Sequence, residues 1–141
     1  MLILAPAVAV LAGCTGDLLT PERVMGVYQL KEVDGKPLPV VCGWTAVHAA
    51  SIELRSDGTL EWMRDYTQTV YSSYEGQPPG PPRFVVRGGG AYELRGRQVV
   101  LRFQDATGVV TREAPLEGRR MTVGGLFTCG DGRERLAVFE R

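Results

Sequence analysis

The chain has 141 residues, of which 44% are hydrophobic, so its length and composition are those of one globular domain with a core to bury. Sixteen basic residues balance sixteen acidic ones, which gives a formal net charge of +0. This balance provides no field that would attract a polyanion, and we therefore expect no nucleic-acid partner.

Residues 1–13 contain no charged side chain and end in Leu-Ala-Gly, directly before Cys14. An apolar residue and two small residues followed by cysteine resemble the lipobox of bacterial lipoproteins, in which a peptidase cuts before a cysteine that is then acylated. The resemblance implies that residues 1–13 are a lipoprotein signal peptide, incomplete because it lacks a basic start, and that Cys14 carries the lipid. Residues 14–23 would form the lipidated tether. The protein would then be anchored in the bacterial cell envelope, facing the periplasm or the cell exterior.

The alternative interpretation of this segment is a core strand over residues 2–11, with Cys14 as an ordinary buried thiol. Pro6 argues against it, because proline lacks the N–H that a central strand needs. A membrane-spanning helix is not expected either, because the apolar stretch is shorter than the ~20 residues that such a helix requires. We therefore expect anchoring by acyl chains, of which two or more give a durable attachment.

Short runs of alternating apolar and polar residues follow, which is the period of strands with one buried face. A single helical turn is expected at residues 20–23, with Pro21 in its first position. Strands are expected at residues 25–33, 38–42, 51–55, 59–69, 83–94, 99–103, 109–116, 121–127 and 133–141. In the last strand Leu136 and Val138 are expected to face inward. Residues 43–50 fit no single pattern.

Residues 90–103 give the clearest hairpin, with a polar turn around Gly96 between two alternating halves. The same spacing of apolar residues around a turn glycine recurs at Gly35 and Gly118, which indicates a meander of antiparallel hairpins. Eight to ten strands and almost no helix predict an all-β, antiparallel meander that closes into an 8–10 stranded barrel over residues 24–141. Closure removes the exposed edges that an open antiparallel sheet would leave.

Two stretches interrupt the hairpins. Residues 76–82 carry four prolines, and we expect an exposed loop there because proline cannot donate to a sheet. Three consecutive glycines at 88–90 are expected to let a strand bend at a barrel corner.

The start of the expected domain carries a family resemblance. Residues 26–30 read Gly-Val-Tyr-Gln-Leu, a hairpin turn follows at residues 33–35, and the final strand ends in arginine. This arrangement resembles the small lipocalin-like lipoproteins of bacteria, whose relatives open the first strand with Gly-x-Trp and pack an arginine of the last strand over that ring. The resemblance implies a lipocalin-like barrel in which Tyr28 replaces the tryptophan and Arg141 or Arg135 is its partner.

If Cys14 is lipidated, Cys42 and Cys129 remain as a pair, and an oxidising envelope favours a disulfide between them. In a closed meander the earliest and latest strands meet, so the pairing is sterically reasonable. The alternative is two separate buried thiols. We expect no metal site and no cofactor, because the chain has one histidine, His48, and no Cys-x-x-Cys.

Catalytic motifs are missing from the sequence, including the Gly-x-Ser-x-Gly elbow, His-Glu-x-x-His and the phosphate-binding loop. An acid-base mechanism would have to use His48 or a perturbed carboxylate. We therefore expect a protein that is not an enzyme.

Aromatic residues at inward positions suggest what the barrel holds. The functional interpretation is an envelope lipoprotein that binds a small hydrophobic ligand inside the barrel. The candidate ligand-binding residues are Tyr28, Trp62, Arg64, Tyr66, Tyr92 and Phe103. The alternative is a filled barrel in a structural or protein-interaction lipoprotein, which contacts an envelope protein partner through residues 77–82 and the surface around Tyr71 and Tyr74.

Overall fold

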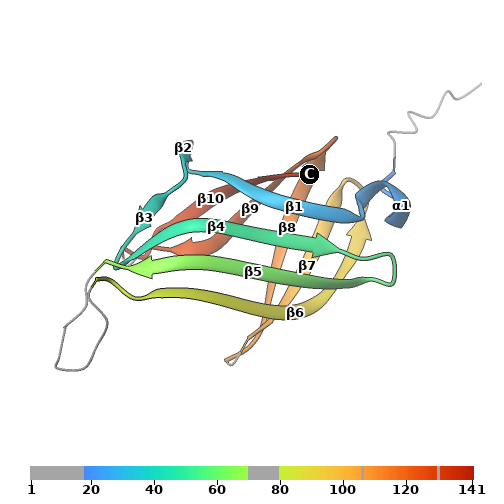
Figure 1. Ribbon diagram of the computed structural model, residues 1–141. Coiled ribbons are helices and arrows are strands. Elements are labelled where there is room, and N and C mark those ends of the chain that lie inside the picture. Colours follow the sequence, from blue (N-terminus) through green and yellow to red (C-terminus); the bar gives the residue numbers. More distant parts are fainter. Residues whose placement is uncertain (1–17, 70–79, 106, 130) are drawn as a thin grey trace, which may run out of the picture.

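The computed structural model describes residues 18–69, 80–105, 107–129 and 131–141 (Figure 1). Cys14, Tyr71, Tyr74 and residues 76–79 of the proline-rich loop lie outside these ranges, so the predictions made for them are not addressed by the structure. One short helix and ten strands make up the described part of the chain. They are α1 (Pro21–Val24), β1 (Gly26–Val33), β2 (Lys36–Pro37), β3 (Val40–Cys42), β4 (Thr45–Leu54), β5 (Thr59–Gln68), β6 (Arg83–Arg95), β7 (Gln98–Asp105), β8 (Gly108–Glu117), β9 (Arg120–Thr128) and β10 (Glu134–Glu140).

The strands form one antiparallel sheet in the order β2-β1-β10-β9-β8-β7-β6-β5-β4-β3. A further pairing of β1 with β4, from Gly26 opposite Leu54 to Gln29 opposite Ser51, closes eight of these strands into a barrel. Strands β2 and β3 are short additions outside the closed ring. The prediction of an all-β, lipocalin-like meander barrel is therefore confirmed (Figure 1).

Hairpin turns occupy the positions that the glycine spacing predicted. Strands β6 and β7 pair up to Arg95 opposite Gln98, and Gly96 between them has a φ of +60°. Strands β8 and β9 are joined in the same way, with Gly118 at a φ of +62°. Glycine adopts this left-handed region without the steric cost of a Cβ, so the turn residues fix the register of both hairpins.

The glycines at 88–90 belong to the continuous strand β6 and permit close contacts on both of its sides. A Cβ on Gly90 would overlap the carbonyl oxygen of Arg102 in the neighbouring strand β7. A Cβ on Gly88 would overlap the indole ring of Trp62, which crosses over it from β5. Glycine is needed here because neighbouring atoms leave no space for a side chain.

One end of the barrel is solid. Helix α1 covers it, and Tyr28 is fully buried beneath, with its hydroxyl donating to the carbonyl of Val24 at 2.7 Å. The guanidinium of Arg141 lies 5.6 Å from the centre of the Tyr28 ring and donates to the carbonyls of Arg23 and Met25, each at 2.8 Å. The aromatic-arginine pair implied by the family resemblance is therefore present, and its arginine is Arg141.

Arg135, the other residue considered for that pair, is instead part of a surface network. It donates to Asp34, in the turn after β1, and to Asp131, in the turn before β10. Asp34 also accepts a hydrogen bond from the backbone N–H of Leu136 at 2.8 Å. These contacts tie the β1–β2 turn to the last strand.

The predicted inward phase of β10 is wrong. Leu136 is 57% exposed, and Val138 lies outside the core cluster although it is nearly covered. The residues that face the core are Ala137 and Phe139, which lie opposite Val123 and Met121 of β9. The run Leu-Ala-Val-Phe is apolar throughout, so alternation alone does not determine which face is buried, and the largest side chain takes the core position.

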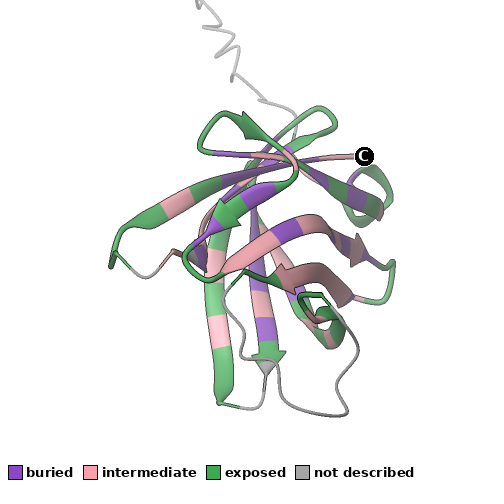
Figure 2. Cartoon of the chain, turned by 60° about the vertical axis from the view of Figure 1, so that its left-hand side comes forward, coloured by how far each residue is buried: buried purple, intermediate pink, exposed green. Residues whose placement is uncertain are grey.

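Residues 43–50, which fitted no pattern, include the first half of β4. The pairing of β4 with β5 shifts register between Val47 and Ala49, as a β-bulge does. A bulge adds one residue to a strand and reverses the phase of the alternation. Val47 and Ala50 are three positions apart, so in a regular strand they would face opposite sides of the sheet. Both are buried here, as the bulge between them allows. Figure 2 shows buried and exposed residues alternating along other strands.

Candidate ligand site

Strands β8 and β9 are the least tightly joined neighbours in the barrel. Their ladder consists of Leu116 opposite Met121 and Glu117 opposite Arg120, next to the turn that connects them. On its other side, β8 pairs with β7 from Gly108 to Pro115. The β7–β8 hairpin therefore diverges from β9 and β10 beyond this turn, as Figure 1 shows, and leaves an opening in the backbone ladder of the barrel.

A cavity of about 530 Å³ occupies the part of the barrel next to this opening. Thr45 and Gln68, a cross-strand pair of β4 and β5 that lines it, belong to the end of the barrel opposite α1. Most of the lining is apolar. The lining residues are Thr45, Ala50, Ser51, Ile52, Trp62, Met63, Arg64, Tyr66, Gln68, Val86, Phe103, Val110, Arg112, Gly125, Leu126, Phe127 and Phe139.

Four of the candidate residues predicted from the sequence line this cavity: Trp62, Arg64, Tyr66 and Phe103. The first three alternate along β5, and Phe103 contributes from β7. Tyr66 also stacks on Phe84 of β6, with ring centres 5.4 Å apart. Four of the six candidate residues therefore surround the hollow part of the barrel.

Tyr28 and Tyr92, the other two candidates, lie in the solid end of the barrel. Each is buried, and each hydroxyl already donates to a backbone carbonyl, that of Val24 for Tyr28 and that of Arg55 for Tyr92. Burial raises the pKa of both hydroxyls. The structure therefore separates these two tyrosines from the residues around the cavity.

Arg64 extends from β5 across the cavity to β9. Its guanidinium carbon lies 4.9 Å from the centre of the Phe127 ring, and its Nη2 lies 3.5 Å from the carbonyl oxygen of Leu126. Burial lowers the pKa of the guanidinium, because removal from water disfavours the charged form. Arginine nevertheless stays charged in proteins, so the cavity wall carries a cation.

Arg112 of β8 is a second cation in the cavity wall, and sequence reasoning did not identify it. Its Nη1 donates to the carbonyl of Thr111 at 2.9 Å and its Nη2 to that of Gly125, across the opening, at 3.2 Å. Ala114 and Leu116, which share its phase along β8, are both buried. This alternation was the available sequence signal that position 112 faces inward.

Two polar N–H groups of the lining have no acceptor within the described part of the chain. They are Nε of Arg112 and Nε1 of Trp62, and both atoms are shielded from solvent. Glycine at position 125 leaves room for Nε of Arg112, since a Cβ on residue 125 would lie 2.9 Å from that nitrogen. Buried N–H donors nearly always have a hydrogen-bond acceptor in proteins, so the lack of an acceptor for these two is unusual.

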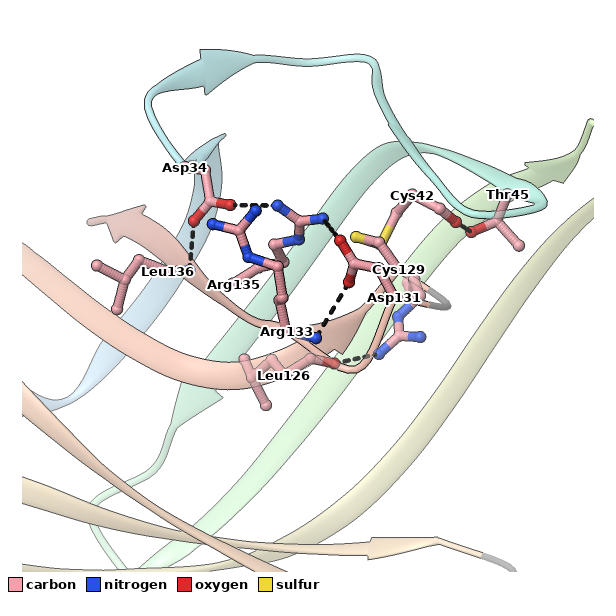
Figure 3. The surroundings of a disulfide bond; sticks show 10 residues. Asp34, Cys42, Thr45, Leu126, Cys129, Asp131, Arg133, Arg135 and Leu136 are labelled. Atoms are coloured by element: carbon pink, nitrogen blue, oxygen red, sulfur yellow. Dashed lines mark hydrogen bonds and ion pairs between the residues drawn. A yellow bond between two sulfur atoms is a disulfide. The ribbon is translucent and has the colours of Figure 1, made fainter.

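The predicted disulfide between Cys42 and Cys129 is present. It joins the end of β3 to the residue that follows β9, and it lies close to Leu126 and Thr45, two lining residues, as Figure 3 shows. Thr45 also donates through its hydroxyl to the carbonyl of Cys42 at 3.0 Å. The cross-link therefore fastens the strands at the hollow end of the barrel.

His48, the one residue considered for acid-base chemistry, does not line the cavity. Its Nε2 is hydrogen-bonded to the hydroxyl of Thr67 at 2.6 Å, across the β4–β5 pair. Across residues 18–69, 80–105, 107–129 and 131–141, no three histidine, cysteine or carboxylate side chains gather in a way that could hold a metal ion.

No protein-family model, no curated protein and no solved structure matches this chain. The one helix in the described ranges is too short to cross a membrane.

Proposed function

We propose that this protein binds a small, largely apolar molecule in the hollow end of its barrel and does so as a lipoprotein of the bacterial cell envelope. The observation that carries the proposal is the cavity of about 530 Å³, which lies within the roughly 300–1,000 Å³ of typical ligand pockets. Its composition also supports binding. Most of the lining residues are apolar or aromatic, and polar atoms contribute nearly half of the lining surface and are available to orient a ligand.

The position of the chain start relative to the barrel suggests how the cavity would be presented. Leu19 donates its N–H to the carbonyl of Gly96 at 3.3 Å, so the described chain begins beside the solid end. Cys14 lies four positions before Leu18, which corresponds to a distance of at most ~14 Å. A lipid on Cys14 would therefore hold the solid end against the membrane and direct the cavity away from it.

The binding proposal is tested with the neutral dye N-phenyl-1-naphthylamine, whose fluorescence increases when it enters an apolar site. Val86 lines the cavity, whereas its neighbour Val85 does not and is 58% exposed. Val86→Trp would fill the cavity from β6, and Val85→Trp adds the same side chain outside the cavity. We expect saturable binding by the wild type, an affinity at least about ten-fold lower for Val86→Trp, and little change for Val85→Trp.

Two results would contradict this proposal. One is the absence of saturable dye binding by a folded wild-type protein. The other is an equal loss of binding in both tryptophan variants, which would indicate that the dye binds outside the cavity.

A second candidate function is protein interaction by an envelope lipoprotein. The observation that favours it is an exposed apolar pair at the β3–β4 turn, in which Trp44 is 76% and Val41 is 68% exposed. Large exposed apolar side chains of this kind often mark contact surfaces. If this candidate is correct, Trp44→Ala removes an envelope partner from cross-linked complexes, and Val86→Trp leaves those complexes unchanged.

A further inference from the structure

We propose that the ligand is an amphipathic anion whose carboxylate or phosphate head group binds between Arg64 and Arg112, with its apolar tail inside the barrel. The inference rests on the proposed function and adds the chemical class of the ligand. It is carried by the placement of two arginines in one cavity wall, next to the opening between β8 and β9.

Both guanidinium groups reach the same short stretch of β9. Arg64 lies 3.5 Å from the carbonyl oxygen of Leu126, and Arg112 donates to that of the preceding residue, Gly125, at 3.2 Å. The two cations therefore converge on one side of the cavity although they start from strands on different sides of it, β5 and β8. The proposal places the head group of the ligand beside this stretch, between the two guanidinium groups.

Neither arginine forms an ion pair with a carboxylate in the ranges that the structure describes. Several surface arginines do form such pairs. Arg83 pairs with Asp65, the neighbour of Arg64 on the outer face of β5, at 2.8 Å, and Arg120 pairs with Glu32 at 3.2 Å. Arg64 and Arg112 are both half-buried, so each cation is partly removed from water, and a bound anion would compensate the charge of both.

The nearest described carboxylate in this region belongs to Glu134 of β10. Its Oε1 and the Nε of Arg112 both lie near the position that a Cβ on Gly125 would take, at 3.3 and 2.9 Å from it. Glu134 is exposed, so water screens its carboxylate, and an anionic ligand would compete with it for Arg112.

The unused donors also fit an oxyanion. A guanidinium has five N–H groups, and the hydrogen bonds to backbone carbonyls of β8 and β9 use only part of those of Arg64 and Arg112. Carboxylate and phosphate oxygens accept such donors in pairs, with shorter and stronger bonds than a backbone carbonyl forms. Beyond the arginines, Ile52 and Phe139 provide an apolar surface for the tail.

The inference is tested by displacing N-phenyl-1-naphthylamine with decanoate, decyl phosphate or neutral decanol, which share one tail. For the wild type we expect each anion to compete at least about ten-fold better than decanol, since hydrogen bonds to charged groups favour the anion. The order of the two anions identifies the head group: a carboxylic acid if decanoate is stronger, and a phosphate ester if decyl phosphate is stronger.

Three methionine variants locate the preference. Methionine keeps much of the length of arginine without its charge, so Arg64→Met and Arg112→Met should each reduce the advantage of the anions over decanol by about ten-fold. The dye affinity of each variant is measured first, so that competition by the anions is compared with competition by decanol in the same protein. Arg97→Met is the matched control, because Arg97 is exposed in the β6–β7 turn at the solid end, and its preference should equal that of the wild type.

The outcomes separate this inference from the proposed function. Dye binding with equal competition by all three decyl compounds overturns the anion inference and leaves apolar binding intact. An anion preference that persists in both cavity variants also overturns it. If the wild type binds neither dye nor decyl compound, both proposals fail. The wild-type comparison decides the question even if a methionine variant does not fold.

Discussion

The disulfide between Cys42 and Cys129 should make a large contribution to stability. It closes a loop across a sequence separation of 87 residues. In the chain-entropy model, a loop of this size lowers the entropy of the unfolded chain enough to stabilise the fold by about 4.6 kcal/mol. For a domain of this length that corresponds to a decrease of about 15 to 20 °C in Tm when the bond is absent.

The perturbation is the double variant Cys42→Ala with Cys129→Ala, compared with the oxidised wild type by urea unfolding. Cys14→Ser is the control, because it removes the third thiol and leaves the cross-link in place. We expect the double variant to lose most of the predicted free energy while its native far-UV spectrum stays that of a β-barrel. A loss below about 1 kcal/mol would refute the reasoning, since the unfolded chain would then gain little entropy from the absent bond.

Three further predictions concern residues away from the cavity. Arg141→Ala should cost about 2 kcal/mol in urea unfolding, because it removes charged hydrogen bonds and the contact with Tyr28; an unchanged midpoint would show that this pair is not stabilising. Gly90→Ala should cost about 3 kcal/mol by its overlap with a backbone carbonyl, whereas Gly96→Ala, with open space around it, should cost only about 1 kcal/mol from its positive φ; equal losses would contradict this. A backbone hydrogen bond from the last strand and an ion pair lower the pKa of Asp34, so its stabilisation is complete above about pH 4 and is lost as the pH falls toward the folded pKa. Asp34→Asn should therefore reduce the loss of unfolding free energy as the pH falls below about 4, and an unaltered acid dependence would exclude this contribution.

Local signals in the sequence predicted much of the fold. Turn glycines such as Gly96 set the hairpins, and the closure of a meander brought the cysteines of β3 and the β9–β10 turn together. The family resemblance implied that Tyr28 pairs with Arg141 or Arg135, and the structure shows Arg141 as its partner. These features depend on residue type and spacing, which a single chain displays directly.

Other features depend on how strands meet. The bulge after Val47 reverses the phase of β4, and the uniformly apolar run around Phe139 fits either face of β10. The separation of β8 from β9 has no local signature, so the opening beside Arg112 could not be located from the sequence. Arg64 was identified because it lies on the same face of its strand as the aromatic residue Trp62, which suggested a ligand site. Arg112 lies on the same face as Ala114 and Leu116, which indicate a buried face but do not suggest a ligand.

The central claim is that the barrel holds a small molecule, and native mass spectrometry of the full-length protein purified from the cells that make it tests this most directly. The account predicts a mass above that of the chain, which disappears on denaturation and belongs to an amphipathic anion. A native mass equal to the denatured mass, in a folded protein that also fails to bind the neutral dye, would contradict the account.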